Sequence, residues 1–265
     1  MRIPFAQIDA FATEAFVGNP AAVMPLTDWP DDAILQKIAE ENNLSETAFL
    51  VPAADEDVDY ELRWFTPGAE VALCGHATLA SGHFVLSSGV EQDSVRFRTR
   101  RSGVLEVARQ DAGYRMSLPA WKPAPRDLPR VVAALRVAGV VDTQFHDKGY
   151  ALVVVDDEAT VRDCAPDLRG LAEEGDLVVI VAAQGREFDI VSRVFVPAFK
   201  IDEDPVTGSA HAVMVPYFAE RLGRDRLTAY QASARGGRLG CSLEGDRVAL
   251  TGTCVTVIEG TFLLP

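Results

Sequence analysis

Two stretches of the chain combine a turn of small residues with a segment that is apolar on every side. The first turn surrounds Gly75 and leads into residues 79–86, and the second surrounds Gly208 and leads into residues 213–218. A helix without a polar face has to be enclosed by the rest of the protein. The pattern therefore predicts two buried helices that begin at these glycines, the second of which should be kinked by Pro216.

The surroundings of these helices repeat as well. An Arg-x-Phe-x-Pro pattern at residues 63–67 recurs at 193–197, an offset of 130, and the two helix-opening glycines lie 133 positions apart. Such an offset in a chain of 265 residues indicates one unit written twice. We therefore expect an N-terminal domain, 1–118, and a duplicated C-terminal domain, 119–253, with an active cleft between them.

The remaining pattern contains more strand than helix. A helix capped by Asp28 should stop at Asn42, and another is expected near residues 130–137. Apolar and alternating runs predict strands at 3–11, 21–26, 44–51, 59–66, 94–99, 103–110, 114–118, 150–155, 177–182, 188–196, 238–243, 248–251 and 255–258. The expected fold is α+β, with two pseudo-symmetric domains, each a curved, mostly antiparallel sheet or barrel wrapped around a central helix.

Charge and composition exclude several classes of partner. The formal net charge of -14 argues against nucleic acid and against an anionic membrane surface. The N-terminus lacks the pattern of a secretory signal, and the longest apolar run, 177–183, is too short to span a bilayer, so we expect a cytoplasmic protein. The four cysteines form no CxxC pair or zinc spacing and are expected to be reduced.

Glu46 is the first candidate for chemistry. In the predicted strand it shares its parity with Leu44, Ala48 and Leu50, so a carboxylate would lie on a largely apolar face. Burial raises the pKa of a carboxyl group, which suits a general base that works near neutral pH. The alternative is a structural glutamate at the rim of the strand, and the spacing alone does not decide between them.

The two helix starts are the second candidate. Their unpaired N–H groups, beside Gly75 and Gly208, would form an anion site suited to a small carboxylate, although the glycines could equally serve close packing. His76, at the start of the first helix, could donate to a substrate oxygen or shuttle a proton, and we expect it to be mostly neutral there. A structural role for His76 is the alternative.

Other chemistry finds less support in the sequence. Asp204 is an acid added before the second helix, either for function or as a helix cap. Cys74 corresponds to Thr207 in the second half, which excludes a symmetrical pair of cysteine bases. Motifs for dinucleotides, phosphate loops and hydrolase nucleophiles do not occur, and His83, seven residues after His76, has no further ligands at zinc spacing. We therefore expect neither a cofactor nor a metal.

Five ordered motifs give the chain a family resemblance. The sequences DAF at 9–11, GNPAAV at 18–23, LSETAF at 44–49, CGHAT at 74–78 and DPVTGSA at 204–210 resemble those of the phenazine-biosynthesis (PhzF-like) isomerases. The resemblance covers essentially the whole chain. It implies the diaminopimelate-epimerase-like fold, in which the last strand, about 254–265, returns to the first domain, and it implies a homodimer.

The resemblance also implies roles for individual residues. Glu46 matches the general acid/base, His76 and Asp204 match polar groups that act on the substrate, and Ser45, Gly75, Gly208 and Ser209 match substrate-binding positions. The implied reaction moves a proton between carbons of a small carboxylate-bearing metabolite, without cofactor or metal. Two alternatives stay open: an amino-acid-type epimerase that uses Glu46 with Asp204, and a protein that binds an anionic metabolite without turning it over.

Overall fold

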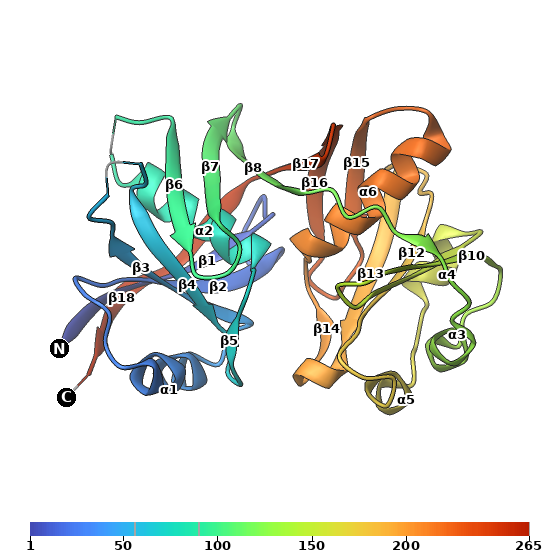
Figure 1. Cartoon of the computed structure of the whole chain (residues 1–265), viewed down its shortest axis with the longest axis horizontal. Helices are drawn as coiled ribbons and strands as arrows, with labels where there is room; N and C mark the ends of the chain where they lie inside the picture. Colours follow the sequence, from blue (N-terminus) through green and yellow to red (C-terminus); the bar gives the residue numbers. More distant parts are fainter. Residues whose placement is uncertain (56, 90, 265) are drawn as a thin grey trace. The chain divides into compact units, whose positions relative to one another are not determined.

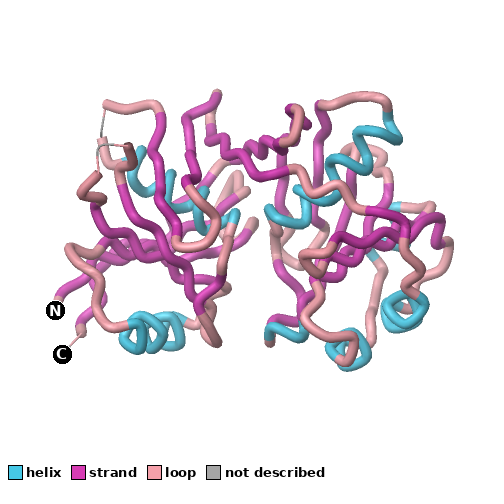
Figure 2. Tube along the Cα trace, viewed as in Figure 1, coloured by secondary structure: helices cyan, strands magenta, loops and turns pink. Residues whose placement is uncertain are grey.

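The computed structural model describes residues 1–55, 57–89 and 91–264, which form two compact units (Figure 1). Unit 1 consists of Met1–Ser117 together with Thr251–Pro265, and unit 2 consists of Leu118–Leu250. Strands dominate both units, and helices are few (Figure 2). Each unit is described by itself below.

Unit 1 is built from one sheet and two helices. Its elements are β1 (Arg2–Ala10), β2 (Asn19–Pro25), α1 (Asp32–Asn42), β3 (Glu46–Pro52), β4 (Tyr60–Phe65), β5 (Glu70–Val71), α2 (Gly75–Ser87), β6 (Ser94–Thr99), β7 (Val104–Gln110), β8 (Gly113–Pro119) and β18 (Cys254–Leu263). β18 pairs with β1 in antiparallel register, from Arg2 opposite Leu263 to Ala10 opposite Cys254. The two ends of the chain thus share one ladder.

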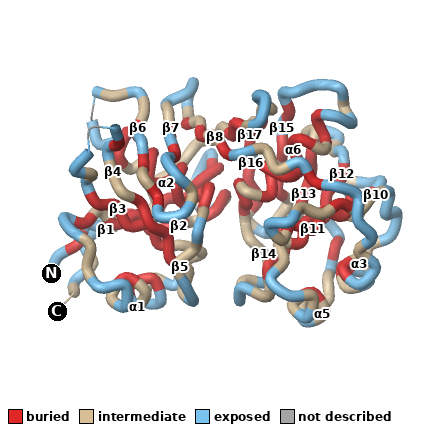
Figure 3. The backbone as a smooth tube through the Cα atoms, viewed as in Figure 1, coloured by how far each residue is buried: buried red, intermediate tan, exposed pale blue. Residues whose placement is uncertain are grey.

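The sheet of unit 1 curves around α2. This helix contacts β1, β2 and β3 as well as β6 and β7, which lie in different parts of the sheet order. Only a curved sheet brings such strands to one helix. Residues 75–82 of α2 are buried without interruption, so the expectation of an enclosed helix is confirmed (Figure 3). The second helix, α1, packs Leu35 and Ile38 into a separate cluster with Phe49 and Phe65.

Unit 2 holds the second copy of this arrangement. Its elements are β9 (Ala124–Pro125), α3 (Pro129–Leu135), β10 (Val140–His146), β11 (Tyr150–Val155), α4 (Glu158–Arg162), α5 (Leu168–Ala172), β12 (Val178–Ala183), β13 (Ile190–Val196), the 3-10 turn η1 (Pro197–Phe199), β14 (Ile201–Asp204), α6 (Gly208–Leu222), β15 (Arg226–Gln231), β16 (Gly237–Glu244) and β17 (Arg247–Gly252). Its core gathers the apolar side chains of β11, β12 and β13 under α3, α4 and α5.

Strand pairing repeats in the same order in the two units. In unit 1, β1–β2 is antiparallel, β2–β3 parallel, β3–β4 antiparallel, β4–β6 parallel and β6–β7 antiparallel. In unit 2 the same sequence of directions runs through β10–β11, β11–β12, β12–β13, β13–β15 and β15–β16. The duplication that the sequence predicts is therefore present in the topology, and the α+β fold is as expected.

Helix α6 runs through Pro216 without a break. Proline has no N–H, so it cannot donate to the carbonyl of Ala212 four residues earlier. The backbone N–H of Trp121 donates to that oxygen instead, at 2.9 Å. The segment that enters unit 2 thereby satisfies the carbonyl that the proline leaves without a helical donor.

Several predicted boundaries were wrong. Helix α1 has Asp31 rather than Asp28 at its N-cap, and the first residues of the expected strand at 44–51 precede β3. Strands β10 and β15 were not predicted, because their apolar residues are interrupted by polar ones such as Gln144 and Gln231. Within the described residues, no helix is long and apolar enough to cross a membrane.

Candidate functional site

Glu46 is the first residue of β3. The strand pairs in parallel with β2, which places Glu46 opposite Ala21. From Thr47 to Val51 every residue of β3 is buried, so the strand has no alternating polar face and the expected parity argument does not apply. The Glu46 side chain itself is 14% exposed. The carboxylate therefore lies at the open end of an apolar strand.

His76 brings an imidazole to this carboxylate. It is the second residue of α2, and its side chain is 4% exposed. Nε2 of His76 lies 3.0 Å from Oε2 of Glu46, and its Nδ1 lies 3.1 Å from Nδ2 of Asn19 and 3.5 Å from Sγ of Cys74. The Asn19 amide makes Nδ1 an acceptor in the neutral ring, so the ring proton then sits on Nε2 and faces Glu46.

Asn19 was not predicted as a site residue, although it belongs to one of the motifs that carry the family resemblance. It is fully buried at the start of β2. Gly18 before it has a φ of +73°, and a Cβ at this position would lie 2.3 Å from the carbonyl oxygen of Ala10. The turn consequently requires glycine, and this turn places the Asn19 amide beside His76.

The charges of this group shift two pKa values. Burial lowers the pKa of His76, but the interactions with Cys74 and Glu46 outweigh it, so the pKa is raised well above its usual value. Burial, followed by the charge of Glu46, raises the pKa of the Cys74 thiol to about 11. The thiol is then uncharged near neutral pH, and the charge that faces His76 is that of Glu46. The direction of this shift is opposite to the one expected from the helix N-terminus, because the interactions with Cys74 and Glu46 outweigh burial.

Unit 2 carries a polar group at the corresponding turn. The side chains of Asp204 and Thr207 are hydrogen-bonded to each other. Gln231, which is fully buried, accepts from the backbone N–H of Thr207 at 2.8 Å and donates to the backbone oxygen of Asp204 at 2.6 Å. Gly208 then opens α6 and the half-buried Ser209 follows. Gln231 was not predicted, and the inward-facing positions of β15 are the only signal for it.

The predicted site residues thus fall into two sets. Unit 1 brings together Glu46, Gly75 and His76, with Ser45 half-buried directly before β3. Unit 2 holds Asp204, Gly208 and Ser209 at the start of α6. His83 does not join His76: its Nδ1 lies 3.0 Å from the hydroxyl of Tyr114 and its Nε2 lies 2.9 Å from that of Thr256.

The donor atoms of Glu46, Cys74 and His76 lie within 4.8 Å of one another, close enough to share a metal ion. In the part of the chain that the structure describes, no other group of three His, Cys, Asp or Glu residues does so. The sequence gives no sign of this set, because the spacing from residue 46 to residue 74 is not that of a recognised zinc motif.

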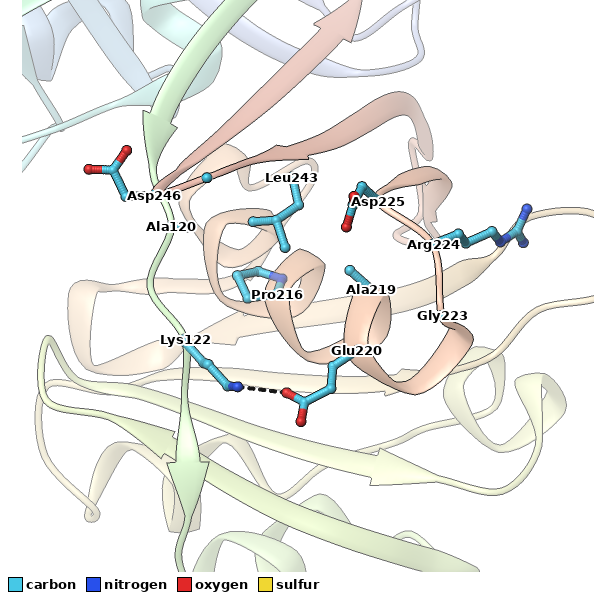
Figure 4. A pocket seen from close by; sticks show the side chains of 11 residues that line it. Ala120, Lys122, Pro216, Ala219, Glu220, Gly223, Arg224, Asp225, Leu243 and Asp246 are labelled. Carbon is cyan, nitrogen blue, oxygen red and sulfur yellow. Dashed lines mark ion pairs between the residues drawn. The ribbon is translucent and has the colours of Figure 1, made fainter.

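Unit 2 also has a cavity of about 540 Å³ beside the second half of α6 (Figure 4). Lys122 and Glu220 form an ion pair of 2.7 Å at its edge, and Pro216 and Leu243 contribute apolar wall. None of the predicted site residues lines it. The charged groups that line it are exposed, so we assign the chemistry to the Glu46–His76 group rather than to this cavity.

Comparisons with known proteins concern the family and the fold. Residues 8–260 match the family model described as phenazine biosynthesis-like protein, PhzC-PhzF. A protein of Pseudomonas aeruginosa named an uncharacterized isomerase is 48% identical over 269 residues, with all of both chains covered. The crystal structure of a PhzF-family phenazine biosynthesis protein from Enterococcus faecalis superposes with a TM-score of 0.91 at 42% identity, again over all of both chains.

A more distant structure shares the fold. A hydroxyproline epimerase from Agrobacterium vitis superposes with a TM-score of 0.64 at 13% identity, covering 98% of this chain and 92% of that one. At this identity the likeness concerns the fold alone.

Proposed function

This chain belongs to the phenazine biosynthesis-like (PhzC-PhzF) family, and from that premise we propose that it is an isomerase that needs no cofactor. The substrate class is a small carboxylate-bearing metabolite, and the reaction moves a proton from one carbon to another. Glu46 is the acid/base. The observation that carries the proposal is the 3.0 Å contact between Oε2 of Glu46 and Nε2 of His76 at the open end of β3.

The proposed reaction uses one carboxylate twice. Glu46 accepts a proton from a carbon whose C–H bond is acidified by conjugation, and the electron pair of that bond shifts along the conjugated system. Glu46 then returns the proton to a second carbon, so that a double bond has moved and no atom is gained or lost. General acid–base catalysis of this kind contributes typically about 10²- to 10⁴-fold.

His76 supports this role in two ways. As an imidazolium it balances the charge of Glu46, because its pKa is raised by the interactions that outweigh burial. Its Nε2 also lies beside Oε2, which leaves the other carboxylate oxygen, Oε1, for the substrate. The N–H groups of the first turn of α2, which starts at Gly75 and is 13 residues long, hold the substrate carboxylate.

The test is hydrogen exchange in heavy water. Purified protein is incubated with a panel of unsaturated and amino carboxylic acids in D₂O, and mass spectrometry reads incorporation of deuterium at carbon. Glu46→Gln should abolish the exchange or reduce it at least about 10²-fold, while binding of the same acids changes no more than a few-fold. Glu41→Gln, an exposed substitution in α1, is the matched control.

Each alternative gives its own outcome in this experiment. Normal exchange in folded, ligand-binding Glu46→Gln would overturn the assignment of the base. Exchange accompanied by inversion of a stereocentre, with loss in Asp204→Asn as large as in Glu46→Gln, would indicate the epimerase. Binding without exchange in the wild-type protein would indicate a metabolite-binding protein.

Four further residues, a homodimer and a cytoplasmic location complete the proposal. Ser45, Gly208, Ser209 and Asp204 are proposed substrate contacts, and alanine substitutions of the two serines should raise the dissociation constant of the ligand without changing the fold. A homodimer and a cytoplasmic location are likewise proposed, and sedimentation equilibrium and cell fractionation test them.

A further inference from the structure

The contact between Glu46 and His76 is close but poorly aligned. Oε2 of Glu46 and Nε2 of His76 are both shielded from solvent and lie 3.0 Å apart, yet neither atom makes a hydrogen bond of good geometry within the described residues. His76 is 97% buried. Two buried polar atoms that face each other without an aligned proton are suited to a shared positive centre.

A thiol completes this arrangement. Sγ of Cys74 lies 3.5 Å from Nδ1 of His76, and one donor atom from each of the three residues falls within 4.8 Å of the other two. Zinc binds nitrogen and carboxylate oxygen at about 2.0–2.2 Å and sulfur at about 2.3 Å, so tetrahedral ligands stand about 3.3–3.6 Å apart. The donors of unit 1, which lie within 4.8 Å of one another, draw closer together to reach this spacing.

We propose that Glu46, Cys74 and His76 form a binding site for one zinc-class divalent cation. The Cys74 thiol and the His76 ring each release a proton when the cation binds. The resulting donor set of one thiolate, one imidazole and one carboxylate matches what borderline-soft cations prefer over magnesium or calcium. Three protein ligands leave the fourth position open, as in labile or catalytic rather than structural zinc sites. Glu46 is the most exposed of the three side chains, and the cation enters on its side.

Asn19 fits the role of supporting residue. Histidines that bind a metal through one ring nitrogen usually donate the other N–H to an oxygen. When Nε2 of His76 binds the cation, Nδ1 carries the proton, and the Asn19 side chain 3.1 Å away accepts it after its amide turns over. The ring therefore keeps its position, while Nδ1 of His76 changes from acceptor to donor and the Asn19 side chain from donor to acceptor.

Occupation of this site has a consequence for the reaction, and that consequence rests on the proposed function. A cation bound to Oε2 of Glu46 prevents that carboxylate from accepting a proton from carbon. Zinc is then a reversible inhibitor, and the protein works when the site is free of metal. The binding itself is independent of any reaction and is measured without a substrate.

The experiment uses tag-free, chelator-treated protein and Co²⁺ as a spectroscopic probe. Cobalt bound to a thiolate gives an intense charge-transfer band in the near ultraviolet, and the wild-type protein should bind one equivalent with this band. Loss of an outer-shell partner already costs about 10- to 100-fold in affinity, so Cys74→Ser, which removes a ligand, should remove the band and weaken binding at least about 100-fold. Cys164→Ser, another buried thiol, is the matched control and should retain both.

A second measurement requires no variant. X-ray absorption of the wild-type protein loaded with one equivalent of Zn²⁺ should show a single sulfur scatterer at about 2.3 Å among nitrogen and oxygen neighbours. A first shell of nitrogen and oxygen alone, or a cobalt band that persists in Cys74→Ser, would overturn the site. Since no turnover is measured, the proposed isomerase reaction stands or falls separately.

Discussion

Arg63 and Glu70 form a forked ion pair in unit 1. Nε of Arg63 lies 2.8 Å from Oε1 of Glu70, and its Nη2 lies 2.9 Å from Oε2. Unit 2 repeats the pair with the same distances between Arg193 and Glu203. Cζ of each arginine also lies 5.0 Å from the ring centroid of the phenylalanine two residues later. The repeated Arg-x-Phe pattern in the sequence thus corresponds to the same side-chain arrangement in each of the two units.

Replacement of Arg63 by lysine should destabilise the protein. The Arg63 side chain is 4% exposed, and an ammonium group cannot reproduce the two parallel hydrogen bonds to Glu70. We expect the free energy of unfolding in urea to fall by about 1.5–3 kcal/mol, the range for hydrogen bonds to charged groups. Arg193→Lys should have a similar cost.

The control for this substitution is Arg98→Lys. Arg98 pairs with Asp55, and both side chains are 41% exposed, so solvent screens the pair and the substitution should leave stability nearly unchanged. Equal losses of stability in the buried and the exposed variant would show that the forked geometry contributes nothing.

Gly82→Ala should destabilise the protein although alanine favours helix. A Cβ at residue 82 of α2 would lie 2.3 Å from Cγ1 and 2.5 Å from Cβ of Val107 in β7, so the helix would have to move off the sheet. Overpacking costs typically about 1–3 kcal/mol, and the gain in helix propensity is about 1 kcal/mol at most. We expect a net loss of up to about 2 kcal/mol in urea unfolding.

Gly68→Ala is the matched control, since the nearest atom to its Cβ is Oγ1 of Thr66 at 3.8 Å. It should leave stability nearly unchanged. A Gly82→Ala protein more stable than the wild type would mean that helix propensity outweighs contact with the sheet and that α2 is loosely packed.

His211 should make stability fall with acidity. Burial lowers the pKa of His211 to about 4, despite the hydrogen bond between its Nδ1 and the carbonyl of Thr207. The unfolded chain takes up this proton near pH 6.5 and the folded one only near pH 4, so stability is complete above pH 6.5 and is lost as the pH falls toward 4. Between pH 7 and pH 5 the loss should be about 2 kcal/mol.

The duplicated half supplies the variant that tests this. Thr78 occupies the position that corresponds to His211, and its hydroxyl donates to the carbonyl of Cys74 four residues earlier, as Nδ1 of His211 contacts that of Thr207. In His211→Thr the difference in unfolding free energy between pH 7 and pH 5 should shrink by about 2 kcal/mol, whatever the effect at pH 7. An unchanged difference would assign the acid sensitivity to other groups.

The duplication and the two enclosed helices follow from local information. A glycine before an uninterrupted apolar run, repeated with the same flanking residues 133 positions later, leaves few other ways to bury both segments. Strand β15 was missed although its inward positions, Leu227, Ala229 and Gln231, alternate. Its inward-facing glutamine, Gln231, is stabilised by hydrogen bonds with the backbone of Thr207 and Asp204. No short-range sequence pattern reveals these contacts.

The candidate site was likewise predicted in part from the sequence and set in part by the tertiary structure. Glu46 and His76 were recognised from motifs, but their 3.0 Å contact depends on the parallel register that sets Glu46 opposite Ala21 and on the seating of α2 against that sheet. Asn19 reaches His76 across 57 residues of sequence for the same reason. Residue type and spacing decided which groups can take part in chemistry. The pairing of strands and the packing of one buried helix decided which of those groups meet, because contacts between distant segments are set by burial of the whole core.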